Sequence, residues 1–508
     1  MLTRQYRSSV RKLFKKILIA NRSEIAVRLI RACHELGITA VAVFSDADRA
    51  SLHVLKADEA YRIGPAPATE SYLNISRIID TAKRCKADAI HPGYGFLSEN
   101  AAFAQACVDA GIKFIGPSPQ SIELMGSKTR ARQQMEKAGV PFVPGSSRGL
   151  ESLASARDLA VKLGYPVMLK AAAGGGGKGM RLVGNESELA SSLDAARSEA
   201  QGAFGNDEVY IEKAITNPRH IEMQVLADEH GNCVYLGERE CSIQRRHQKV
   251  LEEAPSPVVT PEMRSRMGET AVRAAKAASY SNAGTIEFLV DASGSFYFLE
   301  MNTRLQVEHP LTELTTGLDL AHLQIRIAAG EQLPFAQQDV KVRGHAIECR
   351  VYAEDPANRF FPSPGRIASL IEPSGPGIRL DSGIYQGWNV GVDYDPLLSK
   401  LIAYGEDRSQ AITRMQRAIG EYVIGGVKTN LSLFRRILAD PDFIAGKTDT
   451  GYLSRLARES TSGSDSEHEI AAIAAVIWAL EQPDQKCEPA ESASQSAWKK
   501  IGRDEAMR

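Results

Sequence analysis

The chain has 508 residues, too many for one hydrophobic core, and this length indicates roughly three domains. Its 61 basic and 62 acidic side chains give a net charge of -1, which excludes the strong field that recruits nucleic acid or an anionic membrane. No apolar run reaches the ~18 residues of a membrane span, and the seven scattered cysteines, without a Cys-x-x-Cys pair, indicate a reducing cytoplasm and no zinc site.

The first residues of the chain are basic. Residues 1–16 carry Lys and Arg side chains and no acidic ones, which is the composition of a short targeting segment. A secretion signal is excluded because the segment lacks an apolar stretch, and a mitochondrial presequence is normally longer. We therefore expect a disordered basic extension over residues 1–15.

Residues 16–115 alternate between predicted strands and helices. Strands are expected at residues 16–20 and 39–44, around an amphipathic helix at residues 24–36 that Gly37 ends. Further elements are expected at residues 75–84, 87–91, 98–110 and 113–115. This order predicts an open parallel sheet with helices on both faces.

Two turns of this sheet bear on ligand binding. The first, residues 21–24, lacks the glycines that admit a dinucleotide pyrophosphate. The second, residues 91–96, follows a strand at its carboxyl end, which is where such sheets bind ligands. Tyr94 in this turn faces either a cleft or the packed interior, and the sequence favours neither.

A helical linker, residues 116–142, leads to a small second domain over residues 143–214. Within this domain a strand that ends at Lys170 is followed by a glycine-rich loop and then by another strand. The glycine spacing fits G-x-G-x-x-G, but the second strand excludes the Rossmann fingerprint, which needs a helix there. Gly179 stands where a Walker loop needs Ser or Thr, so that motif is excluded as well.

We expect this glycine loop, residues 171–180, to be a flexible lid whose backbone amides close over phosphates. Lys170 would add a point charge at the end of the strand. A plain glycine linker is disfavoured because apolar strands adjoin the loop on both sides. Since few side chains hold the loop, the domain should move as a hinged unit when nucleotide binds. The strand at residues 208–213, which ends the domain, offers an edge to an adenine.

Two later segments carry functional charge. Three of the five residues at 245–249 are Arg or Lys, and because the net charge is near zero a pocket for a small anion is favoured over a nucleic-acid patch. In the strand predicted at residues 344–352, Glu348 and Arg350 share a face, and an ion pair between them is the simplest interpretation.

An antiparallel hairpin is predicted from residues 284–290 and 295–302, which the turn signal Asp-Ala-Ser-Gly joins. Two registers are open. A four-residue loop pairs Val290 with Ser295, and a two-residue loop pairs Ala292 with Ser295.

Strand alternation places Glu300 and Asn302 on one face of this hairpin, with Phe296 and Phe298, and both registers bring Glu287 to the same face. Cross-strand neighbours lie ~5 to 8 Å apart, so two carboxylates and an amide can hold one or two hard cations. Magnesium is the natural candidate because it takes oxygen ligands and keeps coordination positions for phosphate. The alternative is an exposed hairpin with solvated carboxylates.

The main body runs to about residue 457, with a helix at residues 408–422. Residues 459–469 are rich in Ser, Gly, Asp and Glu and predict a linker. Residues 470–480 predict one apolar helix, which we expect to dock on a partner or on the body. The predicted domains are therefore residues 1–15, 16–115, 116–142, 143–214, 215–457 and 458–508.

With these motifs assembled, residues 14–457 resemble biotin carboxylase, the ATP-grasp component of biotin-dependent carboxylases. The resemblance is carried by residues 19–22, 91–100, 174–180, 244–249 and 300–310. It implies an α/β and α+β multidomain fold: an N-terminal open parallel sheet, a two-part ATP-grasp fold and a C-terminal β-rich domain. Ala173 and Lys178 depart from the residues often found there in the family, but the catalytic set is complete.

The resemblance also implies roles for single residues. ATP would be contacted by Lys128, Lys170, Gly176, Gly177, Glu212, Lys213, Ile215, His220, Gln244, His247, Glu287 and Glu300. Two magnesium or manganese ions would be held by Glu287, Glu300 and Asn302. Bicarbonate would be surrounded by Lys249, Arg304, Gln306, Val307 and Glu308. The biotin ring would face Tyr94 and Arg350. The catalytic set would be Glu308, as the base, with Arg304, Lys249 and Arg350.

The implied reaction is ATP-dependent carboxylation of biotin by bicarbonate through carboxyphosphate. A biotin carboxyl carrier protein and a carboxyltransferase subunit would be the partners of a cytoplasmic homodimer, in a carboxylase of the acetyl-CoA or propionyl-CoA type. Biotin is expected on the separate carrier, because residues 505–508 approach an Ala-Met-Lys-Met biotinylation sequence but carry Arg for Lys. The alternatives are a pyruvate carboxylase component, another ATP-grasp ligase and a noncatalytic nucleotide-binding subunit.

Overall fold

The computed structural model describes residues 13–146, 148–171 and 180–459. The chain divides into two compact units, residues 1–453 and 454–508, and the sheets and the candidate site belong to the first. No helix in the described ranges is both long enough and apolar enough to cross a membrane.

Several predicted features lie outside the described residues. These are the basic extension up to residue 12, the glycine loop at residues 172–179 with Gly176 and Gly177, and the linker and apolar helix predicted after residue 459. The expectations for them stay predictions.

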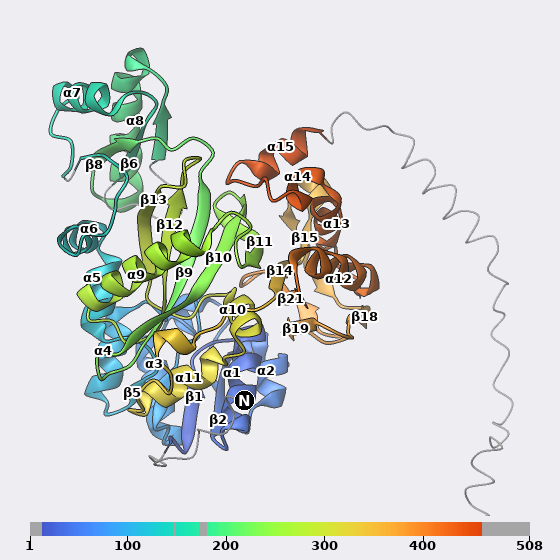
Figure 1. The fold of residues 1–508 in the computed structure, drawn as a ribbon. Coiled ribbons are helices and arrows are strands. Elements are labelled where there is room, and N and C mark those ends of the chain that lie inside the picture. The colour runs from blue at the N-terminus through green and yellow to red at the C-terminus, as the bar shows by residue number, and fades with distance from the viewer. Residues whose placement is uncertain (1–12, 147, 172–179, 460–508) are drawn as a thin grey trace, which may run out of the picture. The chain divides into compact units, whose positions relative to one another are not determined.

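The N-terminal domain is the open parallel sheet that the sequence predicts (Figure 1). Its strands lie in the order β3-β2-β1-β4-β5 and are all parallel. They are β1 (Lys16–Ile19), β2 (Thr39–Ser45), β3 (Glu59–Gly64), β4 (Ala89–His91) and β5 (Lys113–Phe114), with helices α1 (Ser23–Glu35), α2 (Leu52–Lys56), α3 (Ile75–Cys85) and α4 (Ala101–Asp109). Two separate apolar cores form around this sheet and its helices. The edge strand β3 is missing from the predicted elements because only its last two residues are buried.

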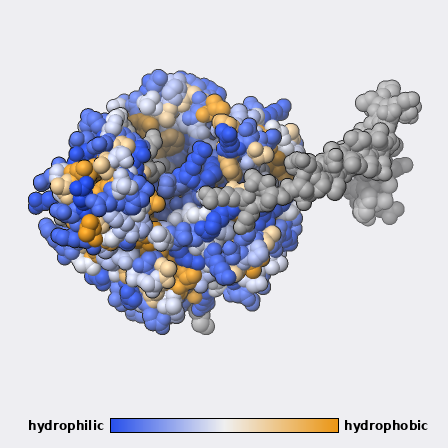
Figure 2. All heavy atoms as spheres, turned by 90° about the horizontal axis from the view of Figure 1, so that it is seen from above, coloured by the Kyte–Doolittle hydropathy of each residue, from blue (hydrophilic) through white to orange (hydrophobic). Residues whose placement is uncertain are grey.

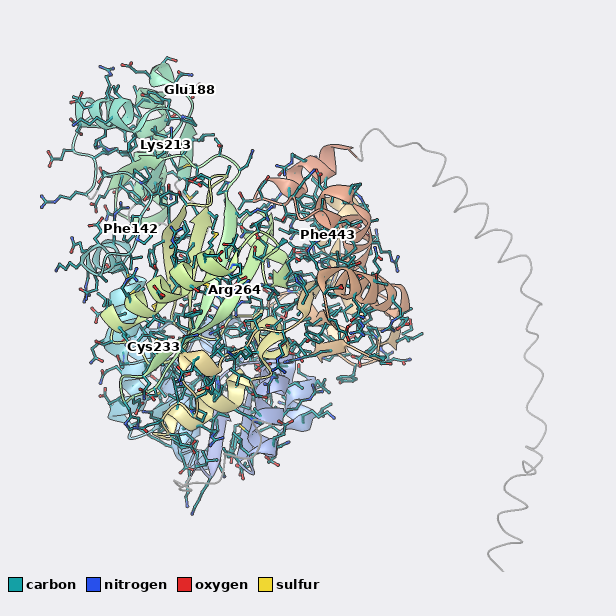
Figure 3. The ribbon with its side chains drawn as sticks, viewed as in Figure 1. Phe142, Glu188, Lys213, Cys233, Arg264 and Phe443 are labelled. Atoms are coloured by element: carbon teal, nitrogen blue, oxygen red, sulfur yellow. The ribbon has the colours of Figure 1, made fainter. Side chains whose placement is uncertain are left out.

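Two helices lead from this sheet to the small second domain, whose sheet has the antiparallel order β7-β6-β8. The elements are α5 (Pro119–Gly126), α6 (Lys128–Lys137), α7 (Leu153–Leu163), β6 (Val167–Ala171), β7 (Met180–Val183), α8 (Glu186–Phe204) and β8 (Val209–Lys213). Apolar side chains of α7 and α8 pack with those of the three strands in a core of their own. Figure 3 labels two side chains of this domain, Glu188 on α8 and Lys213 at the end of β8.

The largest sheet has eight antiparallel strands in the order β13-β12-β9-β10-β11-β14-β21-β19. They are β9 (Arg219–Ala227), β10 (Cys233–Arg245), β11 (Gln248–Ala254), β12 (Asn282–Val290), β13 (Phe296–Asn302), β14 (His345–Tyr352), β19 (Ile378–Ser382) and β21 (Leu397–Gly405). Helix α9 (Pro261–Ala277) packs on apolar side chains of β9, β12 and β13. Because strand side chains alternate, the polar ones of these strands gather on the opposite face.

Two helices follow β13 in the chain. Helix α10 (His309–Thr316) places Leu311 in a small core with β11, β14 and β21. Helix α11 (Leu320–Ala328) shares its core with β1 and α1 of the N-terminal domain. These contacts fix the position of the N-terminal end of α10 over the sheet.

The β12–β13 hairpin corrects the predicted register. Val290 pairs with Phe296, so neither predicted pairing is present at the turn, and a β-bulge then shifts the register so that Glu287 lies opposite Glu300. Phe298 packs in the core under α9, on the other face from Glu300. The predicted grouping of Phe296 and Phe298 with Glu300 is therefore wrong, because the extra residue of the bulge reverses the alternation. The common face of Glu287 and Glu300 is confirmed.

The C-terminal region is β-rich, as predicted. Its remaining elements are β15 (Glu354–Asp355), β16 (Phe361–Pro362), β17 (Gly365–Arg366), β18 (Ser369–Ile371), β20 (Asn389–Val390), α12 (Arg408–Glu421), β22 (Val423–Gly425), α13 (Leu431–Ala439), α14 (Pro441–Ile444) and α15 (Tyr452–Glu459). Figure 2 shows hydrophilic side chains over most of the face in view, with apolar ones in small groups.

Candidate active site

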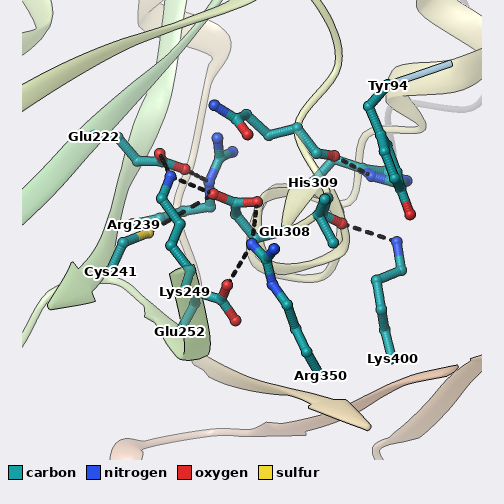
Figure 4. A network of polar contacts seen from close by, with 12 residues as sticks. Tyr94, Glu222, Arg239, Cys241, Lys249, Glu252, Glu308, His309, Arg350 and Lys400 are labelled. Carbon is teal, nitrogen blue, oxygen red and sulfur yellow. Dashed lines mark hydrogen bonds and ion pairs between the residues drawn. The ribbon is translucent and has the colours of Figure 1, made fainter. Parts of the chain in front are cut away.

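Five charged side chains meet on the polar face of the eight-stranded sheet, and Figure 4 labels four of them. They are Glu222 on β9, Lys249 on β11, Glu287 on β12, Arg350 on β14 and Glu308 just before α10. All except Lys249 are buried, and the Lys249 side chain is only 11% exposed. Charged groups so far from water need partners of opposite sign.

Lys249 is the cation that joins three of these carboxylates. Its Nζ lies 2.6 Å from Glu222, 2.8 Å from Glu287 and 2.7 Å from Glu308. Burial alone would lower the pKa of Lys249, but the three carboxylates raise it well above its usual value. The ammonium is therefore charged at neutral pH.

Glu308 lies between two cations. Its carboxylate oxygens are 2.7 Å from Lys249 Nζ and 2.8 Å from Arg350 Nη2. Burial opposes ionisation, but Lys249, Arg350 and Arg239 together hold the pKa of Glu308 well below its usual range. The site thus contains a buried carboxylate that is ionised at neutral pH.

The segment that precedes Glu308 is not extended. Glu308 is the N-cap of α10, with φ -81° and ψ 14°, and Pro310 stands in the first turn of the helix, which begins at His309. An extended segment would direct Arg304, Gln306 and Glu308 to one face by alternation, but the helix cap turns the chain before that pattern is complete. The turn still leaves Arg304 and Gln306 in direct contact, with 3.0 Å between Nη1 and Oε1.

Arg304 is held by residues of two domains. Its guanidinium donates to Glu99 at 2.8 Å and to the Asn302 amide oxygen at 3.0 Å. Glu99 also accepts a hydrogen bond from the backbone of Thr303 at 2.9 Å. Glu99 was not among the predicted site residues, although it lies inside the 91–100 motif, because nothing local indicates its long-range partner.

Arg350 joins Glu308 to a further carboxylate, Glu252 on β11. The same nitrogen, Nη2, lies 2.8 Å from Glu308 and 2.6 Å from Glu252. Glu348 pairs in register with Glu252, and its carboxylate has no hydrogen-bond partner among the described residues. The predicted Glu348–Arg350 ion pair is thus replaced by the pair with Glu252. Burial raises the pKa of Glu348 well above its usual value, because the carboxyl is fully buried and has carboxylates near it.

The predicted cation ligands lie together at the β12–β13 pair. Glu287 is directly opposite Glu300, and the Asn302 amide donates to Glu287 at 2.9 Å. His220, 2.9 Å from Glu287, and Lys249 lower the pKa of that carboxyl in spite of its burial, whereas burial and Glu287 raise the pKa of Glu300. Two carboxylates and an amide oxygen are the hard donors that Mg²⁺ prefers, so the residues fit such an ion.

The predicted ATP contacts divide between the small second domain and the eight-stranded sheet. Lys170 and Glu212 pair at 2.6 Å on neighbouring strands of the small domain, and Arg132 on α6 also contacts Glu212 at 2.9 Å. Lys213 donates to the backbone oxygen of Gly164 at 2.7 Å.

On the eight-stranded sheet, the His220 ring and the Gln244 amide are 2.8 Å apart. His247 is exposed in the β10–β11 turn with a φ of 66°. Ile215 is half-buried between β8 and β9. Lys128 is the first residue of α6, but its side chain lies outside the described residues.

Tyr94 faces the interior and contacts charged groups there. Its hydroxyl donates to Glu24 at the start of α1, and Lys400 Nζ lies 5.8 Å from the centre of its ring. Lys400 is fully buried and donates to the backbone oxygen of Val307 at 2.8 Å. Lys400 was not among the predicted site residues either, because a lysine within a nine-residue strand carries no local sign of such contacts.

Family models match almost the whole described chain. Residues 13–122 match the biotin carboxylase N-terminal domain, residues 127–336 the ATP-binding domain of the carbamoyl-phosphate synthase L chain, and residues 348–455 the biotin carboxylase C-terminal domain.

Curated relatives agree with these matches. A biotin carboxylase from a Nostoc species is 55% identical over 443 residues, 87% of this chain and 99% of the relative. A pyruvate carboxylase subunit from Methanothermobacter thermautotrophicus is 52% identical over 455 residues, 90% of this chain and 92% of the relative.

A solved structure supports the same assignment. The biotin carboxylase domain dimer of 2-oxoglutarate carboxylase from Hydrogenobacter thermophilus, in complex with MgADP, ADP and bicarbonate, is 50% identical. It matches 87% of this chain and 98% of its own chain with a TM-score of 0.83. The chain belongs to the biotin carboxylase family of ATP-grasp ligases.

Proposed function

We propose that the chain carboxylates biotin on a separate carrier protein, with ATP and bicarbonate as co-substrates, as the biotin carboxylase subunit of an acyl-CoA carboxylase of the acetyl-CoA or propionyl-CoA type. The observation that carries the proposed chemistry is the ionised Glu308 carboxylate, held between Lys249 and Arg350. A base with two cations beside it suits a small anion that must lose a proton.

ATP would bind between the small second domain and the polar face of the eight-stranded sheet. Lys128 and Lys170 would lie at the phosphates, and the strand end at Glu212, Lys213 and Ile215 would take the adenine. His220, Gln244 and His247 would complete the nucleotide contacts, as would Gly176 and Gly177. Glu287, Glu300 and Asn302 would hold magnesium, which when bound neutralises phosphate oxygens and polarises the γ-phosphate.

In the first step, bicarbonate would lie against Lys249, Arg304, Gln306 and Val307. Glu308 accepts the bicarbonate proton while the bicarbonate oxygen attacks the γ-phosphorus, and the bond from that phosphorus to ADP breaks. Carboxyphosphate and ADP result. The residues contribute mainly by positioning and charge neutralisation, which is how most phosphoryl transfer is catalysed.

In the second step, carboxyphosphate breaks its C–O bond and gives carbon dioxide and phosphate. The phosphate takes the ureido proton of biotin, and the freed nitrogen attacks carbon dioxide. The guanidinium of Arg350 would stabilise the negative charge on the ureido oxygen, with Tyr94 beside the ring. Such electrostatic stabilisation typically contributes about 3 to 4 kcal/mol per group.

A pyruvate carboxylase is the specific alternative to an acyl-CoA carboxylase. The relative from Methanothermobacter thermautotrophicus is named as a component of a pyruvate carboxylase. Both types share the biotin half-reaction and differ in the carboxyltransferase that follows. We propose that the partner is a carboxyltransferase subunit, and that this chain forms a homodimer by analogy with the dimer from Hydrogenobacter thermophilus.

The test of the half-reaction is ADP release with ATP, magnesium, bicarbonate and free biotin, each omitted in turn. We expect release to require bicarbonate and to rise when biotin is added. Release that needs an amine or a different carboxylate would instead indicate another ATP-grasp ligase. To identify the acceptor, the chain is mixed with a biotinylated carrier and candidate carboxyltransferases, and carboxylation of acetyl-CoA, propionyl-CoA and pyruvate is compared.

A further inference from the structure

Lys400 lies on strand β21, next to the edge strand β19, is fully buried, and has no role in the chemistry described above. Its Nζ donates to the backbone oxygen of Val307 at 2.8 Å and lies 3.4 Å from Glu24 and 3.7 Å from Asp381. Burying an ammonium costs free energy unless the group is paired, so these three contacts are needed to stabilise Lys400 in the interior.

Glu24 connects Lys400 to Tyr94. One carboxylate oxygen of Glu24 accepts the hydrogen bond of the Tyr94 hydroxyl, and the other lies nearest Lys400. Figure 4 shows the Lys400 ammonium close to the Tyr94 ring. Strand β21, helix α1 and the turn after β4 therefore meet at the buried contact between Lys400 and Glu24.

The contact with Val307 constrains the residue that follows it. The peptide between Val307 and Glu308 is trans and planar, so holding the Val307 oxygen also fixes the direction of the Glu308 amide. Glu308 is the N-cap of α10 and carries the carboxylate proposed as the base. An error of about 1 Å at such a residue can cost on the order of 100-fold in rate.

We propose that Lys400 is a positioning residue: by holding the Val307 carbonyl it orients the bicarbonate-binding segment at residues 303–308, and its ion pair with Glu24 links that segment to Tyr94. The inference rests on the proposed function, since it assigns Lys400 to the same reaction. It differs from a stability role because it predicts a defect specific to bicarbonate.

The experiment uses the full chain with the variants Lys400→Met, Glu24→Gln and their double variant. Lys428→Met serves as the matched control, because Lys428 is exposed and pairs only with Asp355 among the described residues. Bicarbonate-dependent ADP release is measured as a function of bicarbonate and, separately, of ATP. Thermal unfolding and ATP binding check the fold of each variant.

For Lys400→Met we expect a 10- to 100-fold loss of kcat/KM for bicarbonate, with the KM for ATP changed less than twofold. The double variant has no unpaired charge from this pair. If Lys400 only neutralised Glu24, the double variant would regain the bicarbonate KM of the natural chain, and the inference would be overturned. We expect the KM to stay raised.

Failure of the inference is distinct from failure of the proposed function. If the natural chain shows no bicarbonate-dependent ADP release, the proposed function is wrong whatever Lys400 does. If it does show that release and Lys400→Met leaves kcat/KM for bicarbonate within twofold of the natural chain, only the inference is wrong. Should Lys400→Met not fold, the charge-neutral double variant decides between the same two outcomes.

Discussion

Glu308 and Arg350 form a buried ion pair, with 2.8 Å between Oε2 and Nη2. Glu308 caps the N-terminal end of α10, and Arg350 comes from β14, so the pair depends on how α10 packs on the sheet. Leu311, one turn into α10, packs against β11, β14 and β21 and sets that position.

Replacing Glu308 with Gln should lower kcat by about 10² to 10⁴ and leave ATP binding largely intact, because the amide keeps the shape and cannot accept the proton. Saturation kinetics with bicarbonate provide the check. A kcat that survives at high bicarbonate, with only KM raised, would mean that Glu308 binds the anion and is not the base.

Replacing Lys249 with Met should lower the free energy of unfolding at pH 7 by about 3 to 5 kcal/mol. The change leaves Glu222, Glu287 and Glu308 buried beside one another without their shared cation. Urea unfolding measures the effect. Lys113→Met, which removes an exposed pair with Glu229, is the control and should stay within about 1 kcal/mol of the natural chain.

Replacing Glu300 with Gln should raise the magnesium concentration that half-saturates ADP release by at least about tenfold, since one of two carboxylate ligands is lost. Glu262→Gln changes an exposed carboxylate in the first turn of α9, which packs on the opposite face of the sheet from Glu300, and is the matched control. An unchanged magnesium dependence in Glu300→Gln would remove Glu300 from the cation site.

The Glu24 carboxyl predicts a pH effect on stability. Burial raises its pKa to about 7, although Lys400 opposes the shift. Between pH 4.5 and pH 7, Glu24 keeps a proton in the folded state that it has lost in the unfolded state. The contribution of Glu24 to the free energy of unfolding therefore falls as pH rises from about 4.5 to 7.

Glu24→Gln should therefore gain stability relative to the natural chain between pH 5 and pH 8, by at most about 3 kcal/mol. Urea unfolding at several pH values measures the difference. A difference that stays constant over this range would show that Glu24 is ionised throughout.

Local patterns were enough to predict the parallel sheet and the common face of Glu287 and Glu300. Apolar periodicity and turn residues report on neighbours in the chain, and both features depend on them. The β-bulge at β13 was not predictable, because one inserted residue leaves no compositional sign and yet reverses every side chain after it.

The residues that contact Arg350 and Val307 could not be predicted from local sequence patterns either. Glu252 and Lys400 lie in strands that read as ordinary buried elements, and they reach Arg350 and Val307 only through strand pairing and the packing of α10. The family resemblance supplied the predicted site residues, whereas the residues that contact them came from the tertiary structure.

The most direct test of the proposed chemistry follows one oxygen atom. If bicarbonate attacks the γ-phosphorus, its oxygen stays with the phosphate when carboxyphosphate breaks down. With bicarbonate labelled in all oxygens with ¹⁸O, ATP, magnesium and free biotin, mass spectrometry should find one labelled oxygen per phosphate released. Phosphate without the label would mean that water attacks ATP, and would contradict the account.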